Sequence, residues 1–98
     1  MSKRKSDVTN YAAVTSGEID MLDFDAAVIH ASSPTAVGNL IVEETLDGGT
    51  TWIQVSSTAT AIGTALRVTV AFPTATRIRF RYSAGNGGAT RVQRVKQQ

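Results

Sequence analysis

The sequence is poor in the residue types that carry most enzyme and metal chemistry. Its 98 residues include no cysteine, one histidine and two prolines. Without cysteine, disulfides and thiolate metal sites cannot form, so stability must come from packing, backbone pairing or assembly. His30 is the one histidine, and no residue near it in the sequence completes a nucleophile–base pair. We therefore expect a packed or sheet-edge histidine, no enzymatic activity and no cofactor.

Long apolar runs are also missing. No stretch approaches the roughly 20 apolar residues of a membrane-spanning helix. The N-terminal sequence MSKRKSDVTN is basic, but no apolar segment follows it as in a secretory signal. We expect residues 1–10 to form a flexible basic N-terminal arm and residues 11–98 to form a single β-sandwich domain, with no membrane partner. A short helix over residues 7–14 is a further possibility for the start of the chain.

Acidic and basic residues occupy different parts of the chain. All eight acidic residues lie at or before Asp47, whereas seven of the ten basic residues follow it. Two interpretations remain open: the two parts of the chain pair within one fold, or an acidic and a basic surface bring copies of the chain together. The cluster Asp20, Asp23 and Asp25 contains the best candidate ligands for Ca²⁺. No glycine-bearing ligand loop follows it, so we favour solvated acids or partners for arginines, and no metal site.

Short segments with period-two alternation fill the rest of the chain. The clearest is residues 76–82, where Ile78, Phe80 and Tyr82 alternate with three arginines. Strands are predicted over residues 17–24, 26–31, 38–46, 50–55, 65–72, 76–82 and 89–95, and residues 56–64 are predicted to be a loop. Seven or eight short strands with short connections indicate an all-β fold, an antiparallel β-sandwich of the jelly-roll type.

The segment TLDGGTTWIQV, residues 45–55, predicts a tight hairpin turn. The Asp47 side chain can accept hydrogen bonds from backbone N–H groups, and the following glycines can adopt the positive φ that the turn needs. Thr45, Asp47, Gly49, Thr51 and Trp52 resemble the Asp-box, a structural β-hairpin found in sialidase propellers and other β proteins. The pattern occurs once, in a chain too short for a propeller, so we expect a structural turn and no glycosidase activity.

The candidate binding residues are two groups of cations. Arg77, Arg79 and Arg81 lie at alternate positions of one strand, which places their side chains in one row about 6–7 Å apart. The row needs compensating charge, from Glu43 or the Asp20–Asp25 group within the fold, from a protein partner, or from phosphate. The basic stretch from Lys3 through Arg4 to Lys5 is the second group. Nucleic acid is the less favoured partner, because Phe80 and Tyr82 point away from the arginines and offer no stacking platform beside them.

A wider resemblance covers roughly residues 17–96. GNLIVEETLDGGTTW, the later ATRIRFRYS and the glycine turn after it resemble small β-sandwich structural proteins of tailed-phage virions, of the head-decoration or tail-fibre type. The resemblance implies a virion location on the capsid surface, with the major capsid protein or another virion protein and further copies of the chain as partners. Two alternatives stay open. One is a tail, neck or fibre component. The other is a carbohydrate-binding module, since the hairpin and the late arginine strand also resemble discoidin-like sugar-binding sandwiches, with Trp52 or Tyr11 as stacking platform.

Overall fold

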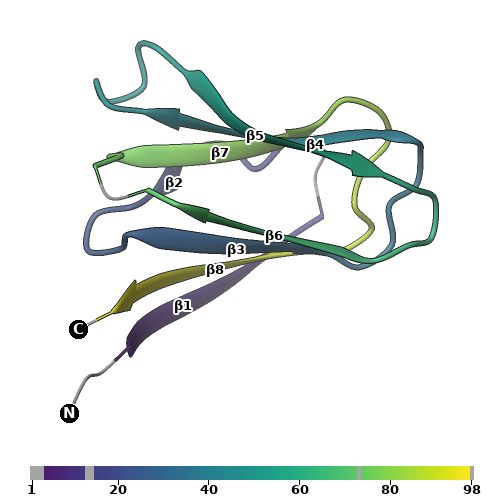
Figure 1. Ribbon diagram of the computed structural model, residues 1–98, viewed down its shortest axis with the longest axis horizontal. Coiled ribbons are helices and arrows are strands. Elements are labelled where there is room, and N and C mark those ends of the chain that lie inside the picture. Colours follow the sequence, from purple (N-terminus) through teal and green to yellow (C-terminus); the bar gives the residue numbers. More distant parts are fainter. Residues whose placement is uncertain (1–3, 13–14, 73, 98) are drawn as a thin grey trace.

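The protein is a two-layered sandwich of eight antiparallel strands (Figure 1). The computed structural model describes residues 4–12, 15–72 and 74–97, with the backbone alone for residues 4, 5 and 97. The strands are β1 (Arg4–Tyr11), β2 (Ile19–Asp20), β3 (Ala26–Ala31), β4 (Gly38–Thr45), β5 (Ile53–Thr60), β6 (Leu66–Ala71), β7 (Arg77–Tyr82) and β8 (Thr90–Gln97). In the part of the chain that the structure describes, no helix is long and apolar enough to cross a membrane.

The strand order is that of a jelly roll. One sheet has the order β1-β8-β3-β6 and the other β2-β7-β4-β5, so consecutive strands mostly lie in opposite sheets. Every pairing within the sheets is antiparallel. The all-β fold class and the jelly-roll arrangement predicted from the sequence are therefore confirmed.

The core lies between the sheets and is built from the alternating residues of the inner strands. Ile29, Val42, Ile78 and Phe80 are fully buried or nearly so. The Phe80 ring makes edge-to-face contacts with the rings of Tyr11 and Tyr82, at centroid distances of 5.5 and 5.8 Å. Such contacts add to the free energy gained from burying apolar area. The alternation read from residues 76–82 is thus confirmed, with three inward side chains and three outward arginines.

Three sequence predictions are wrong about where strands lie. The strand predicted over residues 17–24 is limited to β2, Ile19–Asp20. Residues 4–11 form β1, which pairs with β8 over its whole length, so the prediction of a flexible arm is wrong for residues 4–10 and the helix over 7–14 is excluded for residues 7–11. Residues 56–60, predicted to be loop, continue β5 along β4. Both segments are edge strands, where small and polar side chains are tolerated because one side faces water. Lys3 lies outside the described residues.

Candidate functional site

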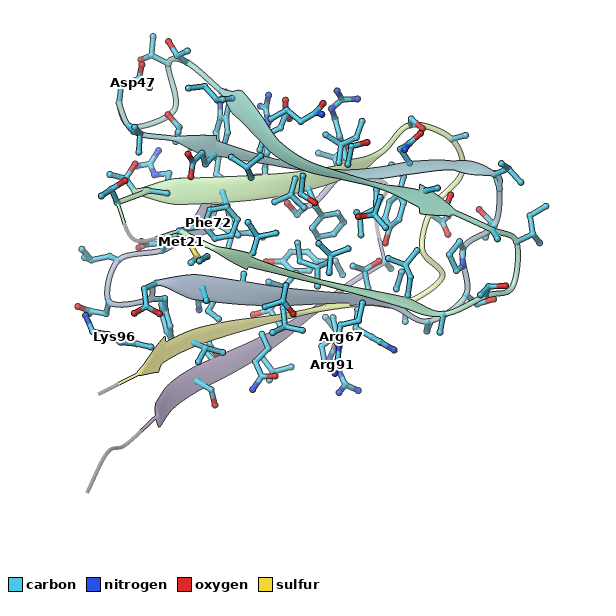
Figure 2. The ribbon with its side chains drawn as sticks, viewed as in Figure 1. Met21, Asp47, Arg67, Phe72, Arg91 and Lys96 are labelled. Carbon is cyan, nitrogen blue, oxygen red and sulfur yellow. The ribbon has the colours of Figure 1, made fainter. Side chains whose placement is uncertain are left out.

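The hairpin between β4 and β5 is held by its own side chains. Asp47 Oδ1 accepts hydrogen bonds from the backbone N–H groups of Thr50 (3.1 Å) and Thr51 (2.9 Å) and from Thr45 Oγ1 (2.7 Å). The Trp52 indole N–H donates to the Gly49 carbonyl oxygen at 3.2 Å. Figure 2 shows Asp47 at the tip of this hairpin, at one end of the sandwich. All of these hydrogen bonds lie within the hairpin, so the Asp47 carboxylate has a structural role in the turn.

The Asp47 carboxylate makes the hairpin sensitive to acid. Its hydrogen bonds, first that from the Thr51 backbone and then that from the Thr45 hydroxyl, lower its pKa from 3.8 to about 2. A carboxyl whose pKa is lowered by folding stabilises the fold above the unfolded pKa, and this contribution is lost as the pH falls towards the folded value.

Asp47→Asn should therefore lower the melting temperature at pH 7 and have progressively less effect as the pH falls from about 4 towards 2, where the wild-type carboxylate itself takes up a proton. Thermal melts of both proteins across this pH range measure the difference. Thr50→Ala is the control, because Thr50 contributes only its backbone N–H to Asp47 and the substitution keeps that group. A gap between wild type and variant that stays constant from pH 7 to pH 2 would show that the charge of Asp47 does not support the turn.

Acidic side chains of the same chain pair with the arginine row of β7. Glu43 Oε1 on the neighbouring β4 lies 2.9 Å from Arg79 Nε and 3.6 Å from Arg81 Nε. Glu18 Oε1 lies 2.7 Å from Arg77 Nη1. Acidic residues within the fold therefore compensate the arginine row. Glu43 was among the expected partners, whereas Glu18 was not indicated by the sequence. The row faces outward from sheet β2-β7-β4-β5, and its three arginines share two glutamates, so most of its charge is compensated within the fold.

A further ion pair among the described residues also joins an early strand to a late one. Arg94 on β8 pairs with Asp7 on β1, and its guanidinium also lies over the Phe24 ring at 4.6 Å. Asp7, Glu18 and Glu43 precede Asp47, whereas all four arginines that they contact follow it. These ion pairs connect acidic residues from the early part of the chain with arginines from the late part. They can form because the jelly roll places early strands beside late ones.

Neither aromatic ring proposed as a sugar-stacking platform is freely exposed. Arg79 covers one face of the half-buried Trp52 ring, with its guanidinium carbon 4.2 Å from the ring centroid. Tyr11 is half-buried and packs its ring against Phe80, and burial raises the pKa of its phenol.

A cleft opens at the same end of the sandwich as the hairpin. Its volume is about 730 Å³, and it lies between the loop that follows β2 and the segment that precedes β7. Exposed Leu22 and half-buried Phe24 line it together with Asp23, Arg77 and Lys96. Asp23 has a positive φ of 72°, which is uncommon outside glycine. Within the described ranges, no three His, Asp or Glu side chains converge on a point where they could hold a metal ion.

Two further arginines, Arg67 and Arg91, flank His30 on the other sheet, and no local sequence pattern indicated them. His30 on β3 is directly opposite Arg67 on β6 and directly opposite Arg91 on β8. His30 is half-buried on an interior strand, so it is neither packed in the core nor at a sheet edge. Arg4 and Lys5, predicted as partner-binding residues, fall in the edge strand β1 of this sheet.

Comparison with known proteins establishes the fold and no closer relationship. No protein-family model matches the sequence, and no curated protein matches it. The SPBc2 prophage-derived protein YomS has a similar structure, with a TM-score of 0.65 and 14% identity over 98% of this chain and 96% of YomS. An F5/8 type C domain from Bacteroides fragilis gives a TM-score of 0.52 and 6% identity, over 83% of this chain and 64% of that one. A Lactobacillus plantarum protein gives 0.51 and 13% identity, over 93% of this chain and 38% of that one.

Proposed function

We propose that the chain is a non-enzymatic structural protein of a tailed-phage virion, and specifically a decoration protein on the outside of the capsid. The observation that carries this proposal is the likeness to the prophage-derived protein YomS, which extends over nearly the full length of both chains. A jelly roll of this size has two broad sheet faces, and each can lie flat on a neighbouring protein (Figure 1).

The mechanism is binding by many weak contacts. A domain of 98 residues offers one contact face of moderate size to each neighbour. On a symmetric shell the same contact recurs many times, and copies that also touch one another gain from effective concentration. Decoration of this kind bridges adjacent capsid subunits and needs no catalytic residue.

Particles purified on a density gradient from cells that carry the gene test this proposal. Quantitative mass spectrometry should find the chain in the particle fraction, in a copy number comparable with that of the major capsid protein. A copy number near that of tail, neck or fibre proteins would instead favour the alternative of a tail component. Absence of the chain from particles would refute the virion role.

The cleft near the hairpin supports one second candidate, a carbohydrate-binding module. It combines apolar surface from Leu22 and Phe24 with the Asp23 carboxylate, and sugar recognition needs both kinds of group. Calorimetric titration with a panel of monosaccharides separates the two functions. The decoration role predicts no saturable heat. The sugar-binding function would be favoured by saturable binding that is lost in Asp23→Ala and kept in Thr69→Ala, a control substitution on the opposite sheet.

A further inference from the structure

The outer face of sheet β1-β8-β3-β6 has an unusual composition. Ile29 and Val92 point into the core, so their neighbours along β3 and β8 point outward. Among residues whose side chains the structure describes, the register then defines twelve outward positions, which are Ser6, Val8, Asn10, Ala26, Val28, His30, Arg67, Thr69, Ala71, Arg91, Gln93 and Val95. Arg4 and Gln97, described by their backbone alone, also fall at outward positions of the register. None of the twelve is Asp, Glu or Lys. Protein–protein interfaces are depleted in the same three residue types and enriched in arginine.

The charge on this face is not compensated within the described part of the chain. Asn10, Arg91, His30 and Arg67 lie side by side across the four strands. Both arginines are exposed, and neither takes part in any of the ion pairs seen among the described residues. Figure 2 shows them on the side of the sheet that faces away from the other sheet. This contrasts with Arg77, Arg79 and Arg81, each of which has a glutamate partner.

A depression between the two arginines gives an acidic group a place to bind. Its volume is about 220 Å³, and it is lined by Val28, His30, Arg67, Arg91 and Gln93. Strands that flank a common neighbour lie about 10 Å apart, so the two guanidinium groups can approach one carboxylate from opposite sides. The planar guanidinium fork suits bidentate binding of a carboxylate.

The other outward positions with described side chains carry no charged residue. Val8 is 50% exposed, and Val28 and Val95 are half-buried on strands that no other element of the described chain covers. Such a surface gives apolar contact beside the cationic row, which is the arrangement of an interface with an apolar centre and charged anchors.

We propose that this face is the docking surface for the virion partner, and that an aspartate or glutamate of that partner binds in the depression between Arg67 and Arg91. The inference rests on the proposed function and adds to it the face that binds and the chemistry of the contact. Two further occupants are disfavoured. A second copy related by a two-fold axis would place the same uncompensated arginines against each other. Nucleic acid would meet no aromatic side chain among the twelve positions, so the face offers no platform on which bases could stack.

The test compares two variants, each of which lacks two positive charges on one face of the sandwich, and the two variants change opposite faces. Arg67→Gln with Arg91→Gln changes the proposed face, and Arg77→Gln with Arg81→Gln is the matched control on the other sheet. Each purified protein is added to particles assembled without this chain, and bound protein is measured by co-sedimentation. Loss of two anchors from an interface should weaken binding by the first variant about 30-fold or more, whereas the control should stay within about threefold of wild type. Val8→Lys, at an exposed position of the same face, should also weaken binding by placing an unpaired charge in the interface.

The outcomes separate the inference from the function on which it rests. If the first variant binds particles as well as wild type does, or if only the control variant loses binding, the proposed docking face is wrong and the virion role stands. No wild-type binding to particles overturns both. If the Arg67 and Arg91 substitutions leave particle binding unchanged but abolish self-association in sedimentation equilibrium, the face binds a second copy. If they leave particle binding unchanged but abolish retention on duplex DNA, the face binds nucleic acid. Thermal melts of all variants ensure that only folded proteins are compared.

Discussion

Phe80→Ala is expected to destabilise the protein by about 3–5 kcal/mol, the range for removing a large aromatic side chain from a packed core. Phe80 is fully buried and lies between the rings of Tyr11 and Tyr82, so its loss removes two aromatic contacts and opens a cavity between the sheets. Small domains have a free energy of unfolding of only about 5–15 kcal/mol, so this variant should be near the limit of folding at 37 °C.

Chemical denaturation followed by tryptophan fluorescence measures this loss. Ile53→Ala is the matched control, because Ile53 is an apolar strand residue that is 52% exposed, and its truncation should change stability by no more than about 0.5 kcal/mol. A loss below about 1 kcal/mol for Phe80→Ala would mean that the space between the sheets is not packed around this ring.

Glu43→Ala is expected to cost about 1–3 kcal/mol, the range for leaving a charged hydrogen-bonding group without its partner at a partly buried site. The Glu43 side chain is 12% exposed and contacts both Arg79 and Arg81. Its removal leaves two adjacent arginines of the row without their acidic partner, so like-charge repulsion adds to the lost hydrogen bond.

A second substitution tests the cause. In the Glu43→Ala background, Arg81→Gln should recover part of the lost stability because it relieves the repulsion, whereas in the wild-type background it should be neutral or slightly destabilising. Added salt should also reduce the cost of Glu43→Ala by screening the repulsion. A cost of Glu43→Ala below about 0.5 kcal/mol would show that Glu43 does not neutralise the row, whose arginines would then be available to a partner.

Local patterns in the sequence were sufficient for most strands. The segment Ala26–Ala31 was predicted with the bounds that the structure has, and the inward and outward residues of β7 were assigned correctly. In both cases one face of the strand is buried, so alternation appears directly in the residue types. β1 was missed because RKSDVTNY has almost no apolar alternation, and its strand geometry comes from pairing with β8 at the far end of the chain.

The arrangement of Arg67 and Arg91 around His30 could not be predicted from local sequence for a different reason. Residues 30, 67 and 91 are far apart in the chain, and only the order β8-β3-β6 places them side by side. The arginine row of β7 was conspicuous because its members are two residues apart, but its charges are used inside the fold. Spacing along the sequence therefore indicated the arginine row of β7, whose charge is largely compensated. Arg67 and Arg91, which have no acidic partner among the described residues, could be recognised as neighbours only from the strand order.

Cryo-electron microscopy of particles that carry the chain tests the central claim most directly, because one map gives both the location and the orientation of the domain. We expect jelly-roll density at symmetry-related positions on the outer shell, with sheet β1-β8-β3-β6 against the capsid and an acidic side chain beside Arg67 and Arg91. Density in which sheet β2-β7-β4-β5 contacts the shell, or particles with no density for this domain, would contradict this claim.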